Sequence, residues 1–197
     1  EALKELDNNL EISGIGGDNM KKAGMELIFH IEETSFMGFT EIITHIPDIL
    51  KIWFSTKAHL KEVDPDLIIL IYYPGFNLRL AKIADKINIP VIYYISPKIW
   101  AWNESRIKKI RKYVNKVFCI LPFEKQWYKQ RQVDAKFLGN PILDQIDPIT
   151  KIENNPVKNI GLFPGSRKQE IKSLLPIMIE SAKRLKKEHP YLEFKVS

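Results

Sequence analysis

The residues best suited to chemistry in this sequence lie in NIGLFPGSRKQE, residues 159–170. A short apolar strand, a Pro-Gly turn and a helix are expected there in succession, because apolar residues recur at helical spacing over residues 171–185. The start of a helix offers free backbone N–H groups to an anion. Ser166 adds a hydroxyl, and Arg167 adds a cation that can bind two phosphate oxygens at once. A phosphate site fits this pattern, and so does an ordinary strand-to-helix turn with a solvated arginine.

Apolar runs of strand length alternate with helical patterns along most of the chain, which predicts a parallel α/β sheet. The run DLIILIYY is apolar almost throughout, as is typical of a strand buried on both faces. A glycine-rich segment at residues 14–17 is expected to form a tight turn. The predicted strands are residues 10–13, 66–73, 91–95, 117–121 and 136–138, and the predicted helices are residues 36–63, 80–87, 103–114 and 123–130.

The alternation stops at residues 146–158, a polar stretch with two prolines, and then begins again. We therefore expect an N-terminal domain at residues 1–145, a linker at 146–158, and the beginning of a second domain at 159–197. The sequence opens on the apparent end of a helix and stops inside an apparent strand. A fragment, cut at both ends, is the expectation.

Composition narrows the class of protein. Of the 197 residues, 45% are hydrophobic and 27% charged, which fits a soluble globular protein. Cys119 is the only cysteine, so no intramolecular disulfide can form, and its apolar surroundings predict a buried thiol. The four histidines do not pair at helical spacing, so no metal site is expected.

The charge is concentrated in one part of the chain. Residues 98–136 hold eleven Lys and Arg against three acids, a net +8, whereas the rest of the chain carries −2. Such a block suggests an anionic partner. Nucleic acid is not expected, because the aromatic residues of the block lie at loop and core positions and no nucleic-acid-binding motif is present.

The helix expected at residues 36–63 carries a wider apolar arc than packing on a core requires. Burial under a neighbouring element and a patch facing a membrane or a partner both fit this excess.

Several segments together are recognisable as those of a known family. PGFNLRLAK (74–82), YYISPKIWAWNESRIKKI (93–110), ILPFEKQWY (120–128), FLGNPILD (137–144) and LFPGSRKQEI (162–171) closely resemble lipid-A-disaccharide synthase. The resemblance runs in one order over nearly the whole chain. It implies an inverting GT-B glycosyltransferase of Gram-negative bacteria, with two Rossmann-like parallel-sheet domains. Relative to that family, the chain lacks the first strand and most of the C-terminal domain.

The resemblance also implies a reaction, the transfer of a sugar from UDP-2,3-diacylglucosamine to 2,3-diacylglucosamine 1-phosphate (lipid X). The products would be a β-1,6-linked lipid A disaccharide precursor and UDP. Neither a metal nor another cofactor is expected, so the departing diphosphate would be bound by Gly165, Ser166, Arg167 and Glu170, with Arg167 as a catalytic residue. The acceptor cleft is expected to hold Asn77, Ser96, Trp100, Trp102 and Asn140.

The resemblance further implies a cytoplasmic enzyme that associates peripherally with the inner membrane and meets an anionic membrane surface. The segment FMGFTEII (36–43) is similar to the membrane-associated region of the family. The expected membrane patch comprises Phe36, Met37, Ile46, Leu50, Trp53 and Phe54.

Tyr72 departs from the family pattern, which has an aspartate at this position as its favoured catalytic residue. A second acid position of the same motif is Gly75 here, and Asn140 replaces a histidine. Tyrosine, with an ordinary pKa near 10, is a poor base at neutral pH. Either another acid such as Glu124 substitutes for it, or activity is reduced or lost.

Two alternative functions therefore remain open at the level of sequence. One is a catalytically impaired relative that binds lipid or UDP-sugar at the membrane. The other is a different GT-B transferase that uses a UDP-amino sugar.

Overall fold

The computed structural model describes residues 2–34, 46–146 and 158–197. The chain divides into two compact units, Glu1–Ile146 and Asp147–Ser197. Most of the linker expected at residues 146–158 lies outside the described residues, as do Phe36 and Met37.

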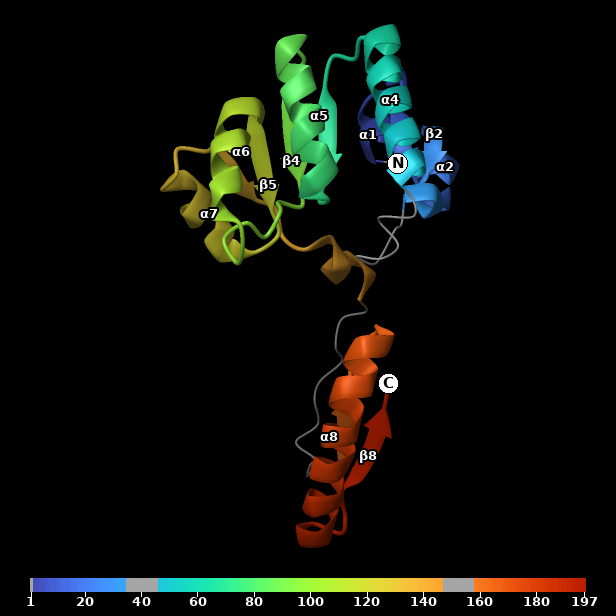
Figure 1. Ribbon diagram of the computed structural model, residues 1–197, viewed down its shortest axis with the longest axis vertical. Helices are drawn as coiled ribbons and strands as arrows, with labels where there is room; N and C mark the ends of the chain where they lie inside the picture. Colours follow the sequence, from blue (N-terminus) through green and yellow to red (C-terminus); the bar gives the residue numbers. More distant parts are fainter. Residues whose placement is uncertain (1, 35–45, 147–157) are drawn as a thin grey trace. The chain divides into compact units, whose positions relative to one another are not determined.

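A four-stranded parallel sheet forms the centre of the first unit (Figure 1). Its order is β3-β4-β5-β6, with β3 at Ile68–Ile71, β4 at Val91–Tyr94, β5 at Lys116–Cys119 and β6 at Ala135–Phe137. The connecting helices are α5 (Pro74–Lys86), α6 (Ile107–Tyr113) and α7 (Pro122–Lys129), preceded at α6 by the short 3₁₀ helix η2 (Glu104–Arg106). A further 3₁₀ helix, η3 (Pro141–Gln145), follows β6. Because every strand runs the same way, all four carboxyl ends meet at one edge of the sheet.

One hydrophobic core holds this sheet and its helices together. Its fully buried members come from α5, α6, α7 and the strands, and include Ala81, Tyr93, Ile110, Val117 and Tyr128. Helix α5 contacts β3 and β4 and lies beside α6, whereas α7 contacts β5 and β6. The alternation of strand and helix expected from the sequence is confirmed for this part of the chain.

The prediction that residues 66–73 are buried on both faces is wrong. Ile68 and Leu70 are buried, but Ile69 and Ile71 are 44% and 39% exposed. The strand alternates because, among the described residues, helix α5 covers only one of its two faces. An apolar run in the sequence does not show whether a helix packs against the second face of the strand.

The N-terminal residues form α1 (Ala2–Leu6), β1 (Ser13–Gly16), α2 (Asp18–Lys22), β2 (Glu26–His30) and the 3₁₀ helix η1 (Ile31–Thr34). Strands β1 and β2 pair in parallel as a separate two-stranded sheet. The strand thus begins three residues later than predicted, and two of the glycines lie within it rather than in a turn. A Cβ atom on Gly16 would lie 2.7 Å from the Met20 sulfur, so glycine permits this close approach of α2.

Helix α4 (Ile46–Val63) joins these two parts of the first unit. Its buried side chains are Ile52, Thr56 and Leu60, at helical spacing. Within the same helix, the His59 ring lies 2.8 Å from the Ser13 hydroxyl, and Trp53 packs edge-on against Phe76 of α5 with ring centroids 5.4 Å apart.

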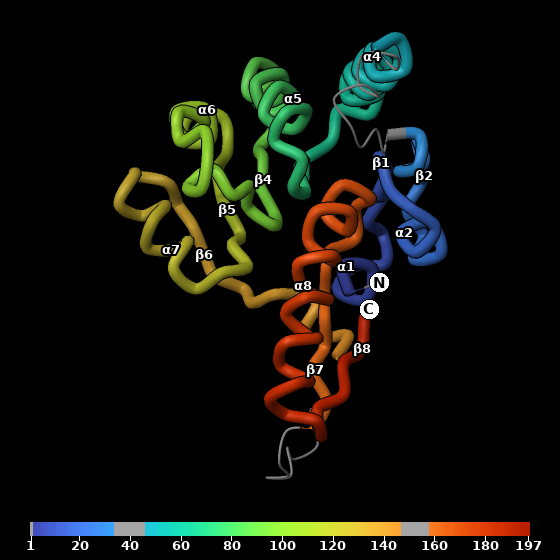
Figure 2. Tube along the Cα trace, turned by 60° about the horizontal axis from the view of Figure 1, so that its bottom comes forward, coloured from blue at the N-terminus to red at the C-terminus, as the bar shows by residue number. Residues whose placement is uncertain are grey.

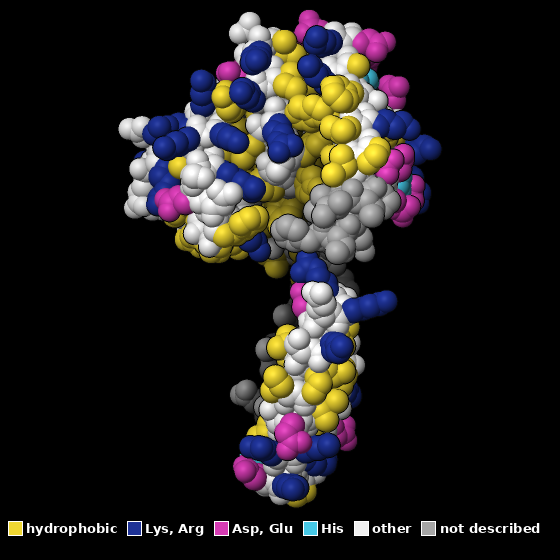
Figure 3. All heavy atoms as spheres, in the orientation of Figure 1, with side chains coloured by type: hydrophobic (Ala, Val, Ile, Leu, Met, Phe, Trp, Pro, Cys, Tyr) yellow, Lys and Arg dark blue, Asp and Glu magenta, His cyan; other side chains and the backbone are white. Residues whose placement is uncertain are grey.

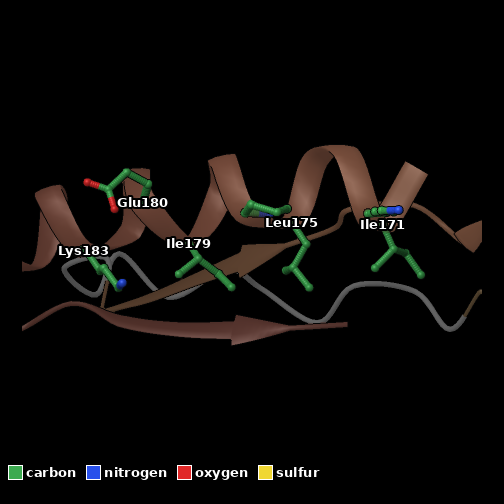
Figure 4. Close-up of a pocket in the computed structure, with 7 residues that line it drawn as sticks. Ile171, Leu175, Ile179, Glu180 and Lys183 are labelled. Atoms are coloured by element: carbon green, nitrogen blue, oxygen red, sulfur yellow. The ribbon is translucent and has the colours of Figure 1, made fainter. Parts of the chain in front are cut away.

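The second unit consists of β7 (Asn159–Leu162), α8 (Lys168–Glu188) and β8 (Glu193–Val196), with the two strands paired in parallel. Figure 2 shows α8 running alongside both strands. Helix α8 carries the apolar periodicity predicted from the sequence, yet among its residues only Ala182 is buried. Ile171, Leu175 and Ile179 line a shallow hollow on one side of the helix (Figure 4).

Candidate functional site

The predicted acceptor residues lie on segments that directly follow the strands of the four-stranded sheet. Tyr72 and Asn77 follow β3, Ser96, Trp100 and Trp102 follow β4, Glu124 follows β5, and Asn140 follows β6. The parallel topology brings these segments to one edge, which is where open α/β sheets bind ligands. The fold thus gathers residues that are up to 68 positions apart in the sequence, Tyr72 to Asn140.

The turn between β3 and α5 is the most strained part of this edge. Tyr72 and Tyr73 have φ angles of 49° and 35°, in the left-handed region, which costs a side-chain-bearing residue about 1–2 kcal/mol. Both side chains are about half exposed. Ile95, directly after β4, is a β-branched residue at φ 55°. Strain of this kind is found where surrounding contacts impose the conformation, and it is concentrated at functional sites.

Those contacts are hydrogen bonds to the main chain. The Tyr93 hydroxyl donates to the carbonyl oxygen of Tyr72. The Asn77 amide donates to the same oxygen and to that of Ile71, both at 2.9 Å. Asn77, predicted as a cleft residue, thus directs its amide at the backbone of the turn. Burial raises the pKa of the Tyr93 phenol far above its ordinary value, partly opposed by the hydrogen bond with Asn77.

Glu124 is fully buried at the start of α7. One carboxyl oxygen accepts a bond from the Trp100 indole nitrogen at 2.9 Å, and the other accepts from the Leu121 backbone nitrogen at 3.1 Å. Trp100 also packs edge-on against Phe123, with centroids 4.9 Å apart. Glu124 therefore ties the loop after β4 to the loop after β5, and in this conformation its oxygens do not face solvent.

Ser96, in the loop after β4, is 1% exposed. Its hydroxyl lies near the Cys119 thiol and the Tyr128 hydroxyl, and its hydrogen bonding opposes the rise that burial causes in the pKa of both groups. The neighbouring Tyr128 hydroxyl donates to the Pro97 carbonyl oxygen at 3.2 Å. Burial, with a smaller contribution from the Glu124 charge, raises the pKa of the Cys119 thiol to about 11, in line with the buried thiol predicted from the sequence.

Trp102 and Asn140 differ in their surroundings. Trp102 is 63% exposed, and the Arg106 guanidinium lies 5.1 Å from the centre of its ring. The Asn140 side chain accepts a bond from the Ile142 backbone nitrogen at 3.1 Å and so caps the helix η3. Trp102 is thus largely exposed, whereas the side-chain oxygen of Asn140 is engaged in local structure.

In the second unit, Gly165 and Arg167 form the predicted turn before α8. Gly165 has φ 104°, and a Cβ atom there would lie 2.5 Å from a Glu170 carboxyl oxygen. The Glu170 carboxylate accepts bonds from the Arg167 backbone nitrogen at 3.3 Å and from its guanidinium at 2.9 Å. These two bonds, the first being the larger cause, lower the pKa of Glu170. Ser166 and Arg167 are exposed.

The described members of the expected membrane patch lie on α4. Ile46, Leu50 and Phe54 are 48%, 47% and 61% exposed, whereas Trp53 is half-buried against α5. Figure 3 shows hydrophobic side chains gathered around α4 and α5, with Lys and Arg beside them. None of the described helices is both long and apolar enough to cross a membrane. In the same residues, no group of three or more His, Cys, Asp or Glu is placed to hold a metal ion.

Comparison with known proteins identifies the family. The family model described as lipid-A-disaccharide synthetase matches residues 1–197. A lipid-A-disaccharide synthase of Coxiella burnetii (strain Dugway 5J108-111) is 40% identical over 202 residues, covering 98% of this chain and 54% of the relative. One from Myxococcus xanthus (strain DK1622) is 40% identical over 200 residues, covering 98% and 52%. The chain belongs to the lipid-A-disaccharide synthase family. It spans about half the length of these relatives.

A solved structure supports the fold expected for a lipid-A-disaccharide synthase family member. UDP-GlcNAc 2-epimerase from Neisseria meningitidis, bound to UDP-GlcNAc, superposes with a TM-score of 0.52 at 12% identity. The superposition covers 95% of this chain and 65% of that one. At this identity the likeness concerns the fold alone, and it confirms the GT-B-type α/β architecture.

Sequence reasoning missed two features of this family member's sheet edge. The role of Tyr93 was not predicted, although a tyrosine within a buried apolar strand needs a hydrogen-bond partner, and this need was an available signal. The bond between Glu124 and Trp100 was also missed, because the two residues are 24 positions apart and lie on different loops.

Proposed function

We propose that the complete protein joins UDP-2,3-diacylglucosamine to lipid X. In this reaction the primary hydroxyl of lipid X attacks the anomeric carbon of the donor sugar. A carbon–oxygen bond forms there, the bond to the UDP oxygen breaks, and the hydroxyl proton passes to a base. The products are the β-1,6-linked disaccharide and UDP. Family membership over the full chain is the observation that carries this proposal.

The donor diphosphate is assigned to the turn before α8. Gly165 keeps the backbone free of a Cβ atom, and the N-terminus of a 21-residue helix favours negative charge. Ser166 and Arg167 are exposed at this point and supply a hydroxyl and a guanidinium. Glu170 orients Arg167 through the bond at 2.9 Å, so that the cation is held near the helix start as charge develops on the departing UDP.

The acceptor is assigned to the carboxyl edge of the four-stranded sheet, where exposed Tyr72 and Trp102 lie. Glu124 is a positioning residue in this proposal rather than the base, because both of its oxygens are engaged and it is fully buried. Association with an anionic membrane surface is assigned to the exposed apolar residues of α4 together with the basic segment at residues 98–136.

Tyr72 favours a second candidate, a relative that binds these ligands without turnover. A half-exposed phenol stands where the family's aspartate is expected, and a phenol is a weak base at neutral pH.

One experiment separates the two candidates. The complete gene product, unaltered and as Tyr72→Asp, is incubated with both substrates, and the disaccharide is measured by mass spectrometry. Turnover by the unaltered protein supports the proposed reaction. Turnover by Tyr72→Asp alone supports the impaired relative. Absence of product from both folded proteins refutes the reaction, and product from an unacylated UDP-amino sugar would point to a different GT-B transferase.

A further inference from the structure

We propose that Tyr93 and Asn77 are positioning residues that hold the turn between β3 and α5, and with it the side chains of Tyr72 and Tyr73, at the edge of the sheet. Their three hydrogen bonds, from one hydroxyl and one amide to two carbonyl oxygens, form what we call the turn clamp. The inference rests on the proposed function, since it assigns this turn to the acceptor site.

The turn needs such a clamp because its backbone is strained. Two successive residues with side chains lie in the left-handed region, and Pro74 begins α5 directly after them. Tyr73 stands at the N-cap position of α5 without a side-chain capping bond. The conformation is therefore not one that the local sequence favours, and contacts from elsewhere in the fold must select it.

The clamp is placed to do this. The Tyr72 carbonyl accepts bonds from both Tyr93 and Asn77, while the Tyr72 backbone nitrogen donates to the Tyr94 carbonyl oxygen at 3.3 Å. The backbone N–H of residue 72 is thus bound through β4, and its carbonyl is bound through both β4 and α5. The side chain of residue 72 is the part left free, and it is 51% exposed.

The two donors differ in how firmly they are held. Tyr93 has no exposed surface and sits in the core among the central strands, so its hydroxyl position is fixed by packing. Its raised pKa keeps the phenol protonated, and so a donor, throughout the neutral range. Asn77 lies in the first turn of α5, and its backbone nitrogen donates to the Tyr73 carbonyl oxygen at 3.1 Å. Strand β4 and helix α5 thus each supply a donor to the Tyr72 carbonyl, and the donor from β4 is the more firmly packed of the two.

Loss of the clamp should therefore lower turnover more than substrate binding. A displacement of about 1 Å at a reacting group reduces rates about 10²-fold. We expect Tyr93→Phe, which removes one oxygen atom from the core, to lower kcat about 10- to 100-fold with KM changed less than about threefold. Tyr94→Phe is the matched control, because Tyr94 is adjacent on β4 and contributes its backbone carbonyl, rather than its hydroxyl, to the turn.

The deciding experiment measures amide hydrogen exchange in the complete gene product, alongside turnover in whichever background, unaltered or Tyr72→Asp, forms the disaccharide. In Tyr93→Phe, the segment 70–78 should exchange about tenfold faster than in the unaltered protein, with segment 116–119 of β5 unchanged. In Tyr94→Phe, both segments should behave as in the unaltered protein. Asn77→Ser, which replaces the two N–H donors of the amide by one shorter hydroxyl and leaves the core intact, serves if Tyr93→Phe does not fold, and it should loosen the same segment.

The outcomes separate this inference from the function on which it rests. If no version of the protein turns over substrate but segment 70–78 loosens only in the clamp variants, the clamp stands and the reaction is wrong. If exchange in the clamp variants equals that in Tyr94→Phe, the clamp is wrong whatever the activity. A uniform drop in stability across all segments would likewise assign Tyr93 to the core alone and overturn the inference.

Discussion

Replacing Glu124 by glutamine tests the hydrogen bonds that connect the loop after β4 with the loop after β5 at the sheet edge. The carboxyl group accepts two bonds, from the Trp100 indole at 2.9 Å and from the Leu121 backbone nitrogen at 3.1 Å. A glutamine amide has the same shape but only one oxygen. One of the two N–H donors must then face an NH₂ group and lose its acceptor in a site with no exposed surface.

The size of the effect follows from that lost acceptor. A buried donor left without a partner costs about 1–3 kcal/mol. Glu104→Gln is the matched control, since Glu104 is exposed and pairs with Arg131 at 2.6 Å on the surface. An exposed pair of this kind contributes about 0–1 kcal/mol. Glu124→Gln should therefore reduce the free energy of unfolding by about 2 kcal/mol, and Glu104→Gln by less than half as much.

Urea unfolding followed by tryptophan fluorescence measures this difference. All four tryptophans of the chain lie in the first unit, so their fluorescence reports on that unit alone. With a slope of about 2 kcal/mol per M, a loss of 2 kcal/mol lowers the urea midpoint by about 1 M. Equal midpoint shifts for the two variants would refute the reasoning, because they would mean that the buried bonds of Glu124 contribute no more than a surface ion pair.

Three other predictions concern a thiol, a turn and a surface. Because burial raises the pKa of Cys119 to about 11, the unfolded thiol ionises first, so stability should be full below about pH 8.5 and decline toward pH 11. Cys119→Ala should remove this component in urea midpoints taken across that range, and an unchanged decline would contradict it. Gly165→Ala should weaken UDP binding measured by calorimetry at least tenfold, because the new Cβ meets Glu170, whereas Gly75→Ala has open space and should stabilise α5 by about 0.5–1 kcal/mol. Phe54→Ser should reduce sedimentation of the complete gene product with vesicles containing anionic lipid, while Leu6→Ser, exposed on α1, should not; equal losses would argue against a patch on α4.

The elements of the first unit were predictable from sequence because their signals are local. The run 91–95 and the helix 123–130 were placed within one or two residues of β4 and α7. Pro74 and Pro122 stand at the first position of their helices, where the missing N–H costs nothing. The strand β2 was missed, because ELIFH is short and has too little apolar periodicity to stand out.

The contacts of the site were not predictable, because they depend on what the fold brings together. Asn77 was expected to face a substrate, yet its amide binds two carbonyl groups of a turn whose left-handed backbone no sequence pattern announced. Glu124 was considered as a base, and its burial became visible only once α7 had been placed against the loop after β4. Residue type and position indicated the edge of the sheet, but not which groups bind ligand and which bind protein.

The proposed acceptor edge and the proposed phosphate turn are each held by a different kind of interaction, so they should respond differently to salt. The turn at Tyr72 and the loop at Trp100 are fixed by hydrogen bonds with donors or acceptors in the core, at Tyr93 and Glu124. The turn before α8 is held by an exposed pair between Arg167 and Glu170. Salt weakens the attraction between exposed charges, with a Debye length of about 8–10 Å near physiological ionic strength. Interactions of buried groups are screened much less. Rising ionic strength should therefore loosen the phosphate turn and weaken UDP binding while leaving the acceptor edge in place.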